Sequence, residues 1–459
     1  MIDVNSLPAE LKTNIFIQFD DLRDVLALSS ASKSFRTALL SVESIIISHI
    51  VLRRIDSELH REVAAVVKSS LITPALWTLQ RVEDVLHCYF ERNDDISTIE
   101  WTLSIGASVA RVHDLVETFA GDFILSALTK LDEPGDGLGV SGVVVSESET
   151  LRCRTAFWRF ELYCNLFRGQ EPKNQKRPKR IDGTDQKVLF FDHLAPYENE
   201  QLACVHDFLY DEVSEAFSDV ASHDIEWACD RYAEEESVEW VDDYMSERII
   251  YKAALLSRGL AGIQEIRDTK SYDDRYNLLQ GPSLGLPEMD FHFLFEGLKC
   301  DDDFWSDNLR LEDLSTEDAK RRATPPFTAE DNDGPFEAWK WANGPHIFEY
   351  YFEPENYYFR QRAYVMWNKA ILEQWGILAI DRRSIPEEWT TTHIPTEAQR
   401  QEERRSILAR RHVYKRGGLG WWSATDETRL VFPSDQKKYA AWLEKREKAR
   451  KPSGGLTFN

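Results

Sequence analysis

The sequence predicts an all-α protein, and three observations support this. Apolar residues recur at helical spacing in one segment after another, as at Phe160, Cys164 and Phe167. Strict alternation of apolar and polar residues, which marks strands, is rare along the chain. No pattern recurs with a period of roughly 20 to 50 residues, as repeat architectures require. We therefore expect a mainly helical, irregular fold without repeats.

Two short helices and the start of a third are predicted near the N-terminus, between Leu7 and Phe35. Pro8 suits a first helical position, because its missing amide would be unpaired there, and Glu10 favours the positive end of the helix. Lys12 falls on the polar face of this helix, and Asp24 can cap the second helix. The apolar stripe of the first helix comprises Leu11, Ile15 and Phe19, widened by Phe16, and the third helix is signalled by Ser32, Phe35, Leu39 and Leu40.

These residues resemble the F-box, the trihelical module by which substrate receptors dock on the Skp adaptor of cullin-RING ubiquitin ligases. The match consists of LPxEL at 7–11, IF at 15–16, DVLALS at 24–29 and SKxFR at 32–36, with an extra residue in the loop at 20–23. The alternative is an N-terminal helical cap that only packs on the body of the protein. The resemblance implies adaptor contacts at Leu7, Pro8, Ile15, Leu26, Leu28 and Phe35.

Helical patterning continues after Phe35 without a linker, so we expect the F-box at residues 1–50 to pack on one larger helical domain at residues 51–459. That domain would bind the substrate. Two long loops are expected within it, a Gly- and Ser-rich one at 132–148 and a basic one at 169–184. Several segments of the domain, such as TAFWRFELYCNLFRG and YVMWNKAILEQWGIL, also resemble uncharacterised fungal F-box-domain proteins, which carry no known site.

The net charge of −24 is unevenly distributed. Residues 198–243 hold sixteen acidic side chains against a single base, whereas residues 400–451 hold fifteen bases against seven acids. Such an acidic protein repels phosphate backbones, which argues against nucleic-acid binding. The basic stretch either lies against this acidic belt, or both are solvated helix faces.

An intracellular protein is expected, cytoplasmic or nuclear. The first residues lack the basic and apolar runs of a signal peptide, and no run of apolar residues is long enough to span a bilayer. The basic run at 173–180 fits either a nuclear-import signal or a solvated loop. Six cysteines without paired spacing predict reduced thiols: Cys88, Cys153, Cys164, Cys204, Cys229 and Cys300.

Motifs for catalysis or cofactor binding find little support. The glycine-rich run at 137–144 matches dinucleotide and kinase patterns, but it lacks a preceding strand and an immediately following helix, and no VAIK, HRD or DFG set accompanies it. No HExxH or GxSxG motif occurs. We expect no metal or cofactor, although one region holds possible zinc ligands, namely Cys204, His206, His223 and Cys229.

Three hypotheses for function follow. The first is a substrate receptor, which binds the Skp adaptor, and through it cullin, with its N-terminal helices and a protein substrate with its helical body. Nine of the fourteen tryptophans lie between Trp305 and Trp442, where aromatic side chains form either a substrate surface or core. The second is an interaction protein that uses the same adaptor outside any ligase. The third, less favoured, is an enzyme of unrecognised type.

Overall fold

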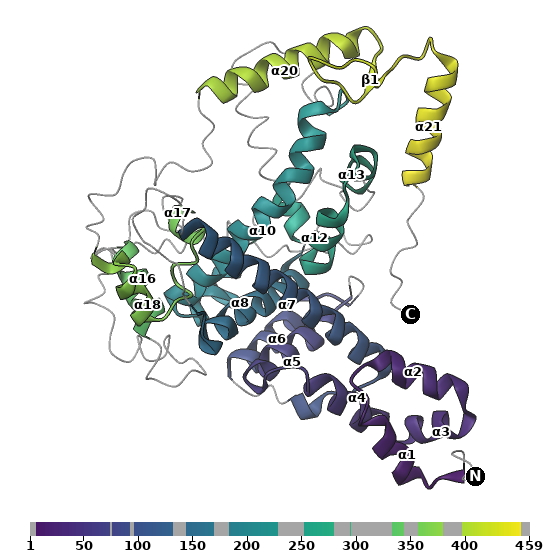
Figure 1. The fold of residues 1–459 in the computed structure, drawn as a ribbon, viewed down its shortest axis with the longest axis vertical. Coiled ribbons are helices and arrows are strands. Elements are labelled where there is room, and N and C mark those ends of the chain that lie inside the picture. Colours follow the sequence, from purple (N-terminus) through teal and green to yellow (C-terminus); the bar gives the residue numbers. More distant parts are fainter. Residues whose placement is uncertain are drawn as a thin grey trace. The chain divides into compact units, whose positions relative to one another are not determined.

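A computed structural model describes residues 6–73, 76–91, 96–131, 144–168, 183–227, 252–279, 294, 333–343, 357–379 and 397–450. Within these ranges the chain is mainly helical (Figure 1). Their one sheet is an antiparallel pair, β1 (Leu419–Gly420) and β2 (Leu430–Val431). The expected all-α class is therefore confirmed.

The chain forms two compact units, and neither is continuous in sequence. The first unit comprises Met1–Val205, Gly297–Glu353 and Phe359–Ser384, and the second comprises the remaining residues. The expected domain boundary at residue 50 therefore does not coincide with a boundary between units. The N-terminal helices belong to the first unit together with the helices that follow them.

The first unit contains most of the helices. In chain order they are α1 (Ala9–Phe16), α2 (Leu22–Ala31), α3 (Lys33–Ser41), α4 (Glu43–Leu52), α5 (His60–Ser70), α6 (Leu79–Phe90), α7 (Leu103–Leu131), α8 (Glu147–Phe167), α9 (Gly183–Leu189), the first part of α10 (Pro196–His223), α16 (Asp333–Asn343) and α18 (Lys369–Gln374). Short 3-10 turns lie at Ser57–Leu59, Ile96–Thr98, Phe191–His193 and Ile377–Ala379.

Helix α8 lies at the centre of the first unit and packs against α5 and α7. The sequence predicts one apolar stripe on this helix, but side chains on its other sides are buried as well, including Trp158 and Arg159. A helix that is buried on all sides needs partners for its charged residues. Helix α8 begins at Glu147, with a capping box formed by Ser146 and Glu149. The last two residues of the loop expected at 132–148 therefore belong to the helix. Residues 132–143 lie outside the described ranges.

A segment from late in the sequence completes the core of the first unit. Tyr364, Val365, Met366 and Trp367 are fully buried. Side chains of earlier helices bind their backbone: Arg152 on α8 donates to the carbonyl of Met366, and Gln201 on α10 donates to the carbonyl of Val365 at 3.1 Å. The segment is therefore fixed to α8 and α10 through its main chain, whatever its own side chains are.

Acidic residues at the start of α10 also hold this segment. Glu200 accepts hydrogen bonds from Arg360 at 2.8 Å and from Tyr364 at 3.0 Å, and all three side chains are buried. One of the two sequence interpretations places the acidic belt, which includes Glu198 and Glu200, on a solvated helix face. Their burial corrects that assignment for the beginning of the belt, because each carboxylate faces a buried arginine. Residues 228–243 of the belt lie outside the described ranges.

The second unit contains the rest of α10 and a group of shorter elements. These are α12 (Gly259–Asp268), α13 (Tyr272–Leu279), α20 (Glu397–Lys415), the β1–β2 pair and α21 (Gln436–Arg450), and α17 (Tyr357–Arg360) lies where the chain passes between the units. The second unit contains a small apolar cluster, formed by Ile225, Val413, Trp422 and Leu430.

The basic helix α20 contacts the end of α10, as one of the two sequence interpretations proposed. Arg410, fully buried, donates from Nη1 to the carbonyls of Ala221 at 2.6 Å and Asp224 at 2.9 Å. The cation thus binds the carbonyl end of a helix, where the helix dipole favours positive charge. The carboxylates of this part of α10 are paired instead with α12 and α13, through Arg267 and Arg275.

Several other expectations concern single segments. Among the described residues no single helix is long and apolar enough to cross a membrane, although α3 and α4, bent by 83° at their junction, meet the length and composition criteria as a pair. The four described cysteines are free thiols, as expected, and burial raises the pKa of Cys153 to about 12. Trp339 and Tyr357 are buried, which favours the core interpretation of the aromatic region.

Gly106 sets how closely α7 approaches the N-terminal helices. A Cβ atom at this position would lie 2.3 Å from Cγ2 of Ile47 on α4 and 3.2 Å from Cδ1 of Leu22 on α2. The N-terminal helices are therefore fixed on α7 by close packing.

Replacement of Gly106 by alanine should destabilise the protein by about 1–3 kcal/mol, because the added methyl group overpacks this contact. Urea unfolding followed by circular dichroism measures the effect. Gly121 on the same helix is the matched control, since a Cβ atom there meets nothing within 4 Å. Gly121→Ala should leave stability unchanged or raise it, and equal losses in both variants would contradict the packing argument.

Candidate functional site

The three N-terminal helices begin close to the predicted positions. Helix α1 starts directly after Pro8, with Glu10 in its first turn. The side chain of Asp21, and not that of Asp24, caps α2 by accepting from the amide of Arg23 at 2.8 Å. Ser32 caps α3 by accepting from the amide of Phe35 at 3.4 Å. Each helix start is thus encoded by a local residue of the kind that favours it.

The interior of this module is built from side chains of all three helices. Phe16 on α1 and Phe35 on α3 meet edge to face, with ring centroids 5.6 Å apart. Val25 on α2 and Leu39 on α3 are buried as well. Pairs of this kind stabilise beyond the area they bury.

Two sequence assignments are corrected by this interior. Phe35, expected to contact the adaptor, is only 2% exposed and forms part of the module's core. Lys12, expected on the polar face, is buried: its ammonium group lies 5.9 Å from the centre of the Phe35 ring and donates to Ser34 Oγ at 2.5 Å. The long side chain of lysine buries its methylene groups while the amine finds a polar partner.

The other predicted adaptor residues lie at the surface. Pro8 and Leu26 are exposed, Leu26 by 51%, while Leu7, Ile15 and Leu28 are partly exposed. Sequence analysis placed Leu11 in the same stripe as Ile15, and it is 48% exposed. Apolar side chains on α1 and α2 thus remain uncovered within the described chain.

Arg53, just beyond α4, fixes the loop that carries the extra residue. Its guanidinium group donates to the carbonyl of Phe19 at 2.7 Å and to that of Ile17 at 3.3 Å, and pairs with Asp20. These carbonyls follow the end of α1 and have no partner within the helix. The loop therefore has defined contacts with the body of the first unit.

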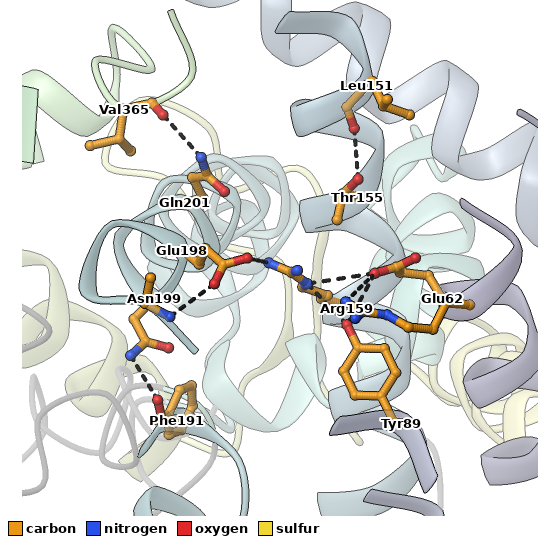
Figure 2. Close-up of polar contacts among 12 residues, drawn as sticks. Glu62, Tyr89, Leu151, Thr155, Arg159, Phe191, Glu198, Asn199, Gln201 and Val365 are labelled. Carbon is orange, nitrogen blue, oxygen red and sulfur yellow. Dashed lines mark hydrogen bonds and ion pairs between the residues drawn. The ribbon is translucent and has the colours of Figure 1, made fainter. Parts of the chain in front are cut away.

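A second concentration of polar residues lies inside the first unit, around Arg159 (Figure 2). From α8, this guanidinium group pairs with Glu198 on α10 at 2.8 Å, and its Nε donates to the hydroxyl of Tyr89 on α6 at 3.1 Å. Tyr89 in turn donates to Glu62 Oε1 on α5 at 3.2 Å, and Arg61 pairs with the same oxygen. Two carboxylates thus face two guanidinium groups, and the cluster is electrically balanced.

The electrostatics of the cluster follow from its burial. Burial acts to lower the pKa of Arg159, but Glu198, Tyr89 and Glu62 together outweigh it and raise the pKa above its ordinary value. Burial likewise raises the pKa of Tyr89. Arg159 therefore stays charged and Tyr89 stays neutral at any physiological pH.

This cluster joins helices α5, α6, α8 and α10. Glu62, Tyr89, Arg159 and Glu198 are all buried, so their groups reach one another and not solvent. Sequence analysis did not single them out. The available signal was the placement of Arg152 and Arg159 within the aromatic-rich run of α8.

The two histidines considered as zinc ligands, His206 and His223, do not converge. His206 and His223 both lie on α10, roughly 25 Å apart at about 1.5 Å per helical residue. His206 contacts Asp207 at 3.0 Å, and His223 contacts the carbonyl of Asp219 at 2.8 Å. In the part of the chain that the structure describes, no three His, Cys, Asp or Glu side chains are grouped to hold a metal ion. Cys229, the glycine-rich run up to residue 143 and the basic run at 173–180 lie outside those ranges.

No family model, curated protein or solved structure matches this chain. The resemblance to the F-box therefore rests on the residues of the N-terminal helices alone.

Replacement of Arg159 by methionine should destabilise the protein by about 3–5 kcal/mol, because the carboxylates of Glu62 and Glu198 then remain buried without their partner. Urea unfolding measures the loss. Arg111→Met, at an exposed position on α7, is the control and should change stability by no more than about 0.5 kcal/mol. Adding Glu62→Gln and Glu198→Gln to the Arg159 variant should restore part of the stability. A neutral single variant would argue against the pairing.

His113 should make folding sensitive to mild acid. It is buried on α7, and burial lowers its pKa below the ordinary value of 6.5. Below about pH 6.5 the unfolded chain therefore binds more protons than the folded one, and stability falls as pH falls, by at most about 1.4 kcal/mol per pH unit for this group.

The His113→Gln variant should lose part of this dependence. Unfolding midpoints in urea at about pH 7.5 and about pH 5.5 make the comparison. Burial lowers the pKa of His193 as well. This residue should therefore keep part of the pH dependence of stability in the variant. If the pH dependence of stability is unchanged in the variant, His113 has the same pKa in the folded and unfolded states, which contradicts this prediction.

Proposed function

We propose that this chain is a non-catalytic substrate receptor of a cullin-RING ubiquitin ligase. Its N-terminal helices would dock on the Skp adaptor, and its helical body would hold a protein to be ubiquitinated. The observation that carries this proposal is the coincidence of two features at residues 7–36. A residue order that resembles the F-box falls on three consecutive short helices, and five of its six implied contact residues keep exposed surface.

Exposed leucines on two helices support a protein partner. Leu11 on α1 and Leu26 on α2 are each about half exposed. Full burial of a leucine side chain contributes on the order of 1.5–3 kcal/mol, so a partner that covers both gains substantial affinity. The module is also fixed to the other helices of the first unit, through close packing at Gly106 and the hydrogen bonds of Arg53. A rigid mount lowers the entropy cost of binding.

Such a receptor accelerates ubiquitin transfer by proximity. It raises the effective concentration of a substrate lysine near the ubiquitin carrier and supplies no reacting group of its own. The buried cluster around Arg159 is compatible with this role, because it serves to hold helices together. We place this activity in the cytoplasm or nucleus, where such ligases act.

Replacement of Leu26 by alanine should weaken adaptor binding by about 2 kcal/mol if this side chain is an anchor of the interface. Purified full-length protein and adaptor, titrated by calorimetry, give the affinity. Stability should change little, because the side chain is exposed. Combined replacement of Leu7 and Pro8 by alanine should have a similar effect.

Leu125 on α7 provides the matched control, since it is 65% exposed and lies outside the module. Leu125→Ala should bind the adaptor as the unmodified protein does. Equal affinity for the Leu26 and Leu125 variants would contradict the docking proposal. Co-purification of cullin together with the adaptor supports the ligase, and an adaptor complex without cullin supports the interaction protein.

A further inference from the structure

An exposed arginine of the second unit lies over two aromatic rings. Arg429 directly precedes β2. Its guanidinium carbon lies 4.5 Å from the centre of the Trp421 ring and 5.2 Å from the centre of the Tyr272 ring. His223 at the end of α10 stacks on the same indole, with ring centres 5.0 Å apart. Arginine stacks well on aromatic faces because its guanidinium group is planar and weakly hydrated.

Both rings are fixed by a single buried residue, Asp224. The hydroxyl of Tyr272 donates to its carboxylate, and Trp421 pairs with its backbone as an isolated β-bridge. Asp224 itself is fully buried, and its other carboxylate oxygen accepts from the amide of Trp227 at 2.9 Å. The platform beneath Arg429 is therefore held in place by main-chain and side-chain contacts.

The hydrogen-bonding capacity of Arg429 is unused. Within the part of the chain that the structure describes, its guanidinium group has no hydrogen bond or ion pair, and the residue is exposed. The nearby Asp426 uses its carboxylate for the amide and hydroxyl of Thr428. A guanidinium group has five N–H donors in a planar fork, which matches the two oxygens of a carboxylate.

We propose that Arg429, oriented by Trp421 and Tyr272, binds a carboxylate side chain in an acidic segment of a partner protein. The assignment of that segment to a ubiquitination substrate rests on the function proposed above, whereas carboxylate binding itself does not. The ligand is a singly charged group and not a phosphate, because Asp426 already places negative charge near Arg429.

The test measures binding of a fluorescein-labelled hexaglutamate peptide to the full-length chain by fluorescence anisotropy, at low ionic strength where charges are little screened. Removal of the fork in Arg429→Ala should weaken binding roughly tenfold, as expected for hydrogen bonds between charged groups. Arg429→Lys should weaken it nearly as much, since lysine keeps the charge but loses the fork and the stacking. Because Arg429 is exposed, both variants should fold as the unmodified protein does, which circular dichroism checks.

Arg416 is the matched control. It is an exposed arginine of the same unit that lies over one ring only, that of Phe432 at 6.0 Å. Arg416→Ala should bind the peptide within about twofold of the unmodified protein. The proposal is overturned if the peptide does not bind, if lysine at position 429 restores full affinity, or if inorganic phosphate competes better than acetate. Adaptor affinity, measured on the same variants, should stay unchanged, which separates this site from the docking surface.

Discussion

Two arginines buried on α8 determine much of the first unit. A guanidinium group keeps its charge in a protein interior, so each one requires acceptors at close range. Arg159 pairs with a carboxylate of α5 and with another of α10. Arg152 donates to the backbone carbonyl of Met366 and to the side chain of Asn368. The helices can take only an arrangement that brings these groups together. Apolar packing makes the interior stable, and the arginines make its arrangement specific.

The helices themselves could be predicted from sequence, because helical periodicity and capping are local properties. Ser32 at the start of α3 and Phe16 in the core of the module are examples. Residues whose environment depends on distant segments could not be predicted. Glu198 and Glu200 belong to an acidic stretch that suggests a solvated face. Both are nevertheless buried, and each pairs with a buried arginine from another part of the chain. Phe35 and Lys12, both expected at the surface, are instead buried in the core of the N-terminal module.

Charge is used differently in the two regions of interest. Around Arg152 and Arg159 in the first unit, charged groups are buried and bind one another or the main chain, so they serve the fold. On the second unit, Arg429 keeps its donors at the surface while aromatic rings fix its orientation. The N-terminal module instead exposes leucines. A buried charge therefore marks a joint in this protein, and the two proposed binding surfaces use side chains that are left uncovered.

The discontinuous first unit also affects how the protein is made. Arg152 leaves the ribosome long before Met366 and Asn368, its acceptors in the finished fold. At typical synthesis rates the interval is on the order of ten to forty seconds. During that time α8 has neither its late partner segment nor a complete core, and its aromatic side chains are open to chaperones or to misassembly. The arrival of the segment that contains Met366 and Asn368 thus completes the core of the first unit during synthesis.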